Sequence, residues 1–227
     1  MSKAGAGAKA QRLLNGNFNM KFMSIGENCQ VAGQLRRTIK IKTTYFDNLV
    51  TPIDGLLQTL NRGVYKPMTP DCFEVGVWEG LPSARELSSG VFFHHEFFDE
   101  HAISPGRETL NIPQYIDHVN EKFKFLSDRF LAIARNSGKK CFVRRQYTGQ
   151  ALDADKLLQV QDALTNLGAK NFSVVNIHNS GDYPGLVVER GIHFYCVPSI
   201  ENTNWLGNNA GWSDAILAVA SDMGALR

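Results

Sequence analysis

Apolar and polar residues alternate in blocks along the chain, and most blocks have the period of a helix or a strand. The clearest helix is predicted from Pro113 to Gly138, because apolar residues recur there at steps of three and four along one stripe. Residues 153–167 and the C-terminal segment from about residue 210 are also predicted to be helical. Short apolar runs that are typical of buried strands occupy residues 21–25, 140–146, 171–178 and 192–197.

The N-terminal half adds further elements to this pattern. Asn28 can cap a helix over residues 29–37, and Thr51 precedes a proline and an acidic residue in a typical helix start that ends at Gly63. Residues 44–50 and 91–98 are predicted to be strands, whereas residues 65–90 are predicted to be a long irregular segment. Strand followed by helix, five times over, predicts an α/β fold with three layers: a mainly parallel sheet with helices on both faces.

The composition fits one folded domain. With 227 residues, 43% of them hydrophobic, the chain is predicted to form a single α/β domain over residues 21–227, preceded by a flexible extension over residues 1–20. No stretch approaches the ~20 apolar residues that a membrane span needs. The four cysteines are far apart in the sequence, and the extension lacks the apolar region of a secretory signal, so we expect a reduced, cytoplasmic protein.

Charge and motif content narrow the expected partners. The net charge of +2 gives no reason to expect a nucleic acid. The one basic cluster, at residues 36–42, is interpreted as a solvated helix end, with anion binding as the alternative. A Walker A sequence, a G-x-G-x-x-G run and a common zinc spacing are all absent from the sequence, so neither a cofactor nor a metal ion is expected.

Cys29 is the strongest candidate for chemistry, because it falls in the first turn of the predicted helix after the first strand. A helix N-terminus favours the thiolate and is expected to lower the thiol pKa, and the same N–H groups, such as that of Gln30, can hold an oxyanion. Asn28 either adds a donor or only caps the helix, while the carboxylate of Glu27 opposes the thiolate. The alternative is that Cys29 is a small buried apolar residue.

A cysteine nucleophile works best with an imidazole and a third group that orients it. His94 and His95 are neighbours on a predicted strand, so only one of them is expected to face the site, and His178 ends another strand. Asp47 is the first choice to orient the imidazole. Glu96 is the alternative, although its position next to His95 on a predicted strand turns it away from that face. Arg144 is predicted either to bind a carboxylate or phosphate of the substrate or to pair with Asp47.

Several short segments resemble, in the same order, those of one mostly bacterial family that is identified, largely by prediction, as papain-like cysteine peptidases. The most specific is SIGENCQ at residues 24–30, followed by QLRR at 34–37. Weaker matches are FD at 46–47, VTP at 50–52, HEF at 95–97, RF at 129–130, FVR at 142–144, NIH at 176–178 and the tryptophans Trp205 and Trp212. Asn48 stands where the family usually has tryptophan, and Glu96 stands where aspartate is usual.

The resemblance selects His95 as the partner of Cys29 and covers nearly all of the chain after residue 20. Papain-like enzymes are α+β proteins with the cysteine on a long central helix. The pattern here instead predicts a strand-to-helix turn, as in esterase-type hydrolases with a G-D-S sequence, a likeness of position only. We therefore expect chemistry at an ester, thioester or amide, with a peptide as one candidate substrate.

The expected function is a cysteine-dependent hydrolase or acyltransferase that acts on a small-molecule, peptide or glycan-linked substrate. Its catalytic residues would be Cys29, His95 and Asp47, and its oxyanion or substrate-binding residues would be Asn28, Gln30, Arg144 and His178. Two alternatives remain: a non-catalytic ligand- or glycan-binding accessory domain that uses the same polar pocket, and a motif that only stabilises the fold.

Overall fold

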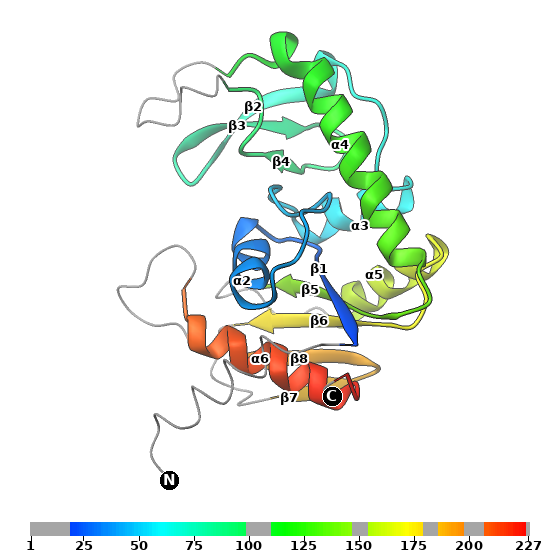
Figure 1. Ribbon diagram of the computed structural model, residues 1–227. Coiled ribbons are helices and arrows are strands. Elements are labelled where there is room, and N and C mark those ends of the chain that lie inside the picture. The colour runs from blue at the N-terminus through cyan, green and yellow to red at the C-terminus, as the bar shows by residue number, and fades with distance from the viewer. Residues whose placement is uncertain (1–18, 99–109, 147–153, 179–185, 198–206, 226–227) are drawn as a thin grey trace.

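The computed structural model describes residues 19–98, 110–146, 154–178, 186–197 and 207–225, and its largest element is a five-stranded sheet (Figure 1). The strand order is β1-β5-β6-β8-β7. The first four of these pair in parallel, and only β7 runs antiparallel to its neighbour β8. The strands are β1 (Met20–Ser24), β5 (Lys139–Arg145), β6 (Phe172–His178), β7 (Leu186–Glu189) and β8 (Ile192–Cys196). The predicted α/β class with a mainly parallel sheet is confirmed.

Two separate clusters of buried side chains include alternate residues of this sheet. Phe22 and Val143 belong to a cluster shared with α2 (Cys29–Ile39) and α6 (Asn209–Asp222). Met23 and Phe142, their sequence neighbours, belong to a second cluster shared with α3 (Ile53–Asn61), α4 (Ile112–Arg135) and α5 (Ala154–Asn166). Because successive strand residues point to opposite faces, the two clusters lie on opposite sides of the sheet.

A second, smaller sheet is antiparallel and has the order β2-β3-β4. It consists of β2 (Phe73–Trp78), β3 (Leu81–Glu86) and β4 (Phe92–Phe93), and a short 3-10 helix, η1 (Pro70–Cys72), precedes it. The ring of Phe93 packs against those of Phe73 and Phe123, which joins this sheet to α4. Figure 1 shows α4 running alongside both sheets.

The structure corrects four predictions in the N-terminal half. Residues 65–90 contain the β2–β3 hairpin rather than only irregular chain. Residues 45–48 form turns rather than a strand, and only Val50 pairs with Phe92 in an isolated bridge. In those turns the Thr44 hydroxyl donates to Asp47, and the Asp47 amide donates back to the Thr44 carbonyl. The predicted strand over 91–98 is limited to two residues before the chain turns, and Pro52, not Thr51, precedes the first turn of α3.

The C-terminal half follows the sequence pattern more closely. Helices α4, α5 and α6 and strands β5, β6 and β8 occupy the predicted segments within a few residues, while β7 was not predicted. Most of the proposed N-terminal extension, residues 1–18, lies outside the described residues. In the described part of the chain, no helix has the length and apolar character that crossing a membrane requires.

Candidate functional site

Cys29 is the first residue of α2 and follows a tight loop at the end of β1. Gly26 in this loop has φ +87°, a conformation that glycine adopts without steric cost. Asn28 caps α2 by accepting a hydrogen bond from the Gln30 amide at 3.1 Å. The predicted position of the thiol at a helix N-terminus is therefore confirmed.

Arg144 supports this loop from the neighbouring strand β5. Its guanidinium donates to the carbonyl of Thr51 at 3.0 Å and approaches that of Ile25 at 3.5 Å. One of its nitrogens lies 3.9 Å from a carboxylate oxygen of Glu27. Burial lowers the pKa of Arg144 to about 10, and the charge of Glu27 opposes this shift. Arg144 is thus a buried residue that holds the loop, and its acidic neighbour is Glu27 rather than Asp47.

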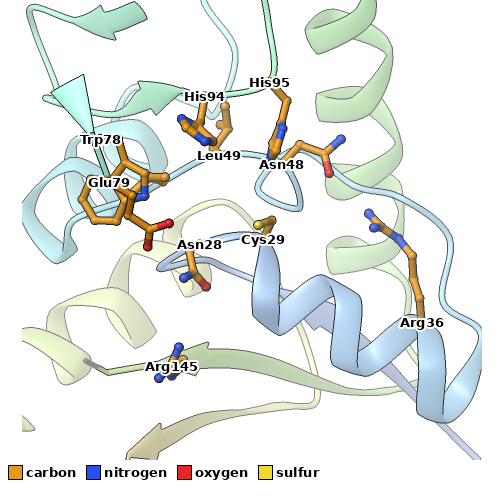
Figure 2. Close-up of a pocket in the computed structure, with 11 residues that line it drawn as sticks. Asn28, Cys29, Arg36, Asn48, Leu49, Trp78, Glu79, His94, His95 and Arg145 are labelled. Atoms are coloured by element: carbon orange, nitrogen blue, oxygen red, sulfur yellow. The ribbon is translucent and has the colours of Figure 1, made fainter. Parts of the chain in front are cut away.

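A pocket of about 610 Å³ lies over the start of α2, between this helix and the hairpin (Figure 2). It is found where ligands of parallel sheets usually bind, at the carboxyl ends of β1 and β5. Its walls come from the loop before α2, α2 itself, the turns around residue 48, the hairpin tip, the turn after β4 and the end of β5. The lining residues are Asn28, Cys29, Arg36, Asn48, Leu49, Val50, Trp78, Glu79, His94, His95 and Arg145.

Both His94 and His95 line the pocket, although the strand pattern predicted that only one would. They lie in the turn after β4, so the alternation of a strand does not apply to them. Their rings are 5.0 Å apart in a T-shaped arrangement. His94 is buried and its Nδ1 is hydrogen-bonded to Ser83 Oγ at 2.6 Å. His95 is exposed, and Figure 2 shows its ring pointing toward the end of α2 that carries Cys29.

The thiol of Cys29 does not have the lowered pKa that its position at a helix start predicted. Burial raises its pKa, and the negative charge of Glu79 adds to this increase. A backbone hydrogen bond at Cys29 and the positive charge of Arg36 act in the opposite direction but do not reverse it. The loss of water around the sulfur therefore outweighs the helix terminus, and the resting group at neutral pH is the thiol.

Asp47 was predicted to orient the imidazole, but its side chain is directed to other partners. Its oxygens accept hydrogen bonds from Arg36 Nη2 at 2.9 Å and from Thr44 Oγ1 at 3.0 Å. The carboxylate is fully buried and is not part of the pocket lining. Asp47 therefore positions Arg36, which does line the pocket, instead of a histidine.

The three remaining predicted site residues, Arg144, Gln30 and His178, are also outside the pocket lining. Gln30 contributes its amide to the helix cap, and His178 is buried at the end of β6. Of the predicted set, the structure therefore brings together Asn28, Cys29 and His95. Glu96, the alternative orienting group, pairs with Lys122 at 2.5 Å.

Several lining residues were missed by sequence reasoning. Trp78 and Glu79 belong to the hairpin, whose tight turn is signalled in the sequence only by the dipeptide Glu79-Gly80. Arg36 was included in the basic cluster and the QLRR segment but not in the candidate site, and Arg145 was given no role. Arg36, Glu79 and Arg145 give the pocket its charged side chains.

The described residues include no group of three or more histidine, cysteine, aspartate or glutamate side chains that could hold a metal ion. Comparison with known proteins found no matching family model, no matching curated protein and no matching solved structure.

Proposed function

We propose that the protein is a cysteine-dependent hydrolase or acyltransferase in which Cys29 attacks an ester, thioester or amide carbonyl. The observation that supports this proposal is that Cys29 and His95 line one open pocket at the carboxyl ends of β1 and β5. The resemblance of the SIGENCQ segment to predicted papain-like cysteine peptidases points to the same residues. A peptide is one candidate substrate, beside small-molecule and glycan-linked acyl groups.

The first half of the reaction forms a thioester. The sulfur of Cys29 bonds to the carbonyl carbon while His95 accepts the thiol proton, and the bond to the leaving group then breaks as His95 returns the proton to it. Backbone amides at the start of α2 are available to stabilise the oxyanion. In the second half, water or another acceptor attacks the thioester and the thiol of Cys29 is restored.

The raised pKa of Cys29 determines how this chemistry would begin. A thiolate–imidazolium pair at rest needs a thiol of low pKa, whereas burial keeps this one protonated. His95 would then remove the proton during the attack, as the histidine of a serine hydrolase does. An exposed imidazole is suited to this role because it exchanges its proton readily with solvent.

The test is the formation of a covalent acyl-enzyme. The protein is incubated with 4-nitrophenyl acetate, and the acetylated residue is identified by peptide mass spectrometry. We expect acetylation at Cys29, none in Cys29→Ala, and a rate about 10²–10⁴-fold lower in His95→Gln. Cys72→Ser is the matched control, because Cys72 is also half-buried but lies outside the pocket lining.

His178→Gln tests the other candidate base. His178 is outside the pocket lining, so this variant should keep the wild-type acetylation rate, provided that its melting temperature shows a folded protein. If Cys29 is acetylated no faster than cysteines of the denatured chain, or if His95→Gln leaves the rate unchanged, the proposal is wrong.

A second candidate function is non-catalytic ligand binding in the same pocket. The raised pKa of Cys29 favours it, because a protonated thiol is a weak nucleophile, and the charged groups of Arg36, Glu79 and Arg145 are suited to a polar ligand. If this second function is the correct one, 4-nitrophenyl acetate forms no acyl-enzyme at Cys29, either in the wild-type protein or in the variants above.

We also infer that the fold has the three predicted layers. The support is the pair of buried clusters, one shared by the sheet with α2 and α6 and the other with α3, α4 and α5.

A further inference from the structure

Opposite charges lie on either side of Cys29 in the pocket. Figure 2 shows Glu79 of the hairpin tip on one side of the sulfur and Arg36 of α2 on the other. Both charges act on the thiol, in opposite directions. Arg145, at the end of β5, adds a second positive charge to the lining. A bound substrate would therefore meet a charge gradient across the reacting sulfur.

Arg36 is placed by the geometry of α2. It follows Cys29 by seven residues, which is close to two helical turns, so the two residues share one face of the helix. With a rise of ~1.5 Å per residue, their backbones are about 10 Å apart along the axis. The pocket extends along this face, because both residues line it.

The guanidinium of Arg36 is held in place by groups that cannot reach the pocket themselves. Asp47 is fully buried and binds Arg36 Nη2 at 2.9 Å, and Thr44 fixes the other oxygen of Asp47. Within the described residues, this is the one hydrogen bond that the Arg36 side chain makes, and 37% of the side chain is exposed. A guanidinium has five N–H donors, so most of them remain for a ligand.

We propose that Arg36 binds a carboxylate of the substrate, so that the pocket selects acyl groups with an anionic end on the Arg36 side of the carbon that Cys29 attacks. This inference rests on the proposed function and adds the substrate class. A solvated helix end, the earlier interpretation of the basic cluster, needs no fully buried carboxylate to orient it. Asp47 provides that orientation, and a guanidinium so fixed matches the planar geometry of a carboxylate.

Other charges define which end of the substrate is anionic. Glu79 repels an anion on its own side of Cys29. Arg145 also lies on that side in Figure 2, but of the charged lining residues only Glu79 and Arg36 act on the thiol. The anionic end therefore belongs on the side of Arg36. Asp47 reduces the net charge there, but it is fully buried and does not line the pocket.

The test compares two esters that differ only in charge: 4-nitrophenyl hydrogen glutarate, which has a free carboxylate, and its neutral methyl ester. We expect wild type to prefer the anionic ester in kcat/KM. Arg36→Gln should reduce kcat/KM for the anionic ester about 10- to 100-fold, as expected for a hydrogen bond between charged groups. The neutral ester should lose far less, because it loses only the effect of the Arg36 charge on the thiol. Lys42→Gln is the matched control, because it removes the same charge from an exposed residue outside the pocket lining.

Asp47→Asn tests the positioning role of the buried carboxylate. Arg36 keeps its charge in this variant but loses its anchor, so the preference for the anionic ester should fall while hydrolysis of the neutral ester continues. A change in the preference, rather than in the rate for both esters, distinguishes positioning from a general loss of folding.

A binding measurement separates this inference from the proposed function. Glutarate is titrated into Cys29→Ser by NMR, where no acyl chemistry is needed, and Arg36→Gln in that background should abolish saturable binding. If no ester is cleaved but glutarate still binds through Arg36, the proposed function fails and the anion site stands. If wild type uses both esters equally and glutarate does not bind, or if inorganic phosphate binds more tightly than glutarate, the carboxylate proposal is overturned.

Discussion

Gly26 is the residue on which the presentation of Cys29 depends most directly. Its φ of +87° is left-handed, and a Cβ at this position would lie 1.6 Å from the Oγ1 of Thr51. Gly63, after α3, has a similar φ of +94° but no atom within 4 Å of a Cβ. The two glycines therefore separate the cost of backbone conformation from the cost of a steric clash.

At this residue scale we expect Gly26→Ala to lower the free energy of unfolding by about 2–5 kcal/mol, since overpacking adds to left-handed strain. Gly63→Ala, which has the strain alone, should lose only ~1–2 kcal/mol. Thr51→Ala removes Oγ1, a buried atom without a hydrogen-bond partner in the described part of the chain, and should recover part of the loss when combined with Gly26→Ala. Urea denaturation measures all four variants, and equal losses for the two glycines would contradict the clash.

At the scale of elements, periodicity predicted the helices and strands whose buried faces are regular. In α4 the buried residues Ile116, Val119, Phe123, Leu126 and Phe130 repeat at three and four, so the sequence alone defines the helix. Tyr45 and Phe46 were interpreted as strand residues because aromatic residues are common in strands. Their side chains are indeed buried, but they belong to turns that the Thr44 and Asp47 side chains stabilise. Tertiary packing, which the local pattern does not contain, determined these segments.

The candidate site could be predicted only in part for the same reason. Cys29 was located because the strand, the cap and the helix that position it are adjacent in sequence. Glu79 and His94 reach the pocket only because the hairpin and the turn after β4 fold over α2, and Arg36 acquires its orientation from Asp47, eleven residues away. Such contacts between separate elements leave no periodic signal in the sequence.

The hairpin tip provides a prediction at the scale of elements. Glu79 and Gly80 both have positive φ, at 50° and 78°, as a type I′ turn requires, and asparagine fits the first position better than glutamate. Glu79→Asn should therefore raise stability by ~0.5–1 kcal/mol. It should also lower the pKa of Cys29, because the carboxylate that disfavours the thiolate is gone.

The pH dependence of iodoacetamide alkylation measures this second effect. A raised pKa keeps the thiol protonated, so the alkylation rate of Cys29 should climb with pH to a midpoint above that of an ordinary cysteine, and in Glu79→Asn the midpoint should move to lower pH. Glu79→Gln is the matched control: it removes the charge without improving the turn, so it should shift the midpoint but not raise the stability. An unchanged midpoint in both variants would show that Glu79 does not act on the sulfur.

At the scale of the whole molecule, the two buried clusters share one sheet. Strand β5 contributes Phe142 to one cluster and Val143 to the other. Loss of either cluster would therefore expose one face of β5. The small sheet is connected to the first cluster through Phe93 and Phe123. The single domain over residues 21–227 stays a prediction, and this arrangement provides a way to test it.

If the clusters unfold as one unit, a cavity on either side of the sheet should destabilise the whole protein. Ile216→Ala, on α6, and Phe123→Ala, on α4, remove fully or nearly fully buried side chains from different clusters and should each cost about 2–5 kcal/mol. Trp78 and Trp205 are first replaced by phenylalanine, so that the fluorescence comes from the buried Trp212 alone. In urea, far-UV circular dichroism and this fluorescence should report the same midpoint in both variants, with an unchanged slope. Phe125→Ala, on the exposed face of α4, is the control for Phe123→Ala and should change stability far less. Midpoints that separate between the two probes in Phe123→Ala would mean that the α4 side of the sheet unfolds on its own, and the single domain would then have to be divided.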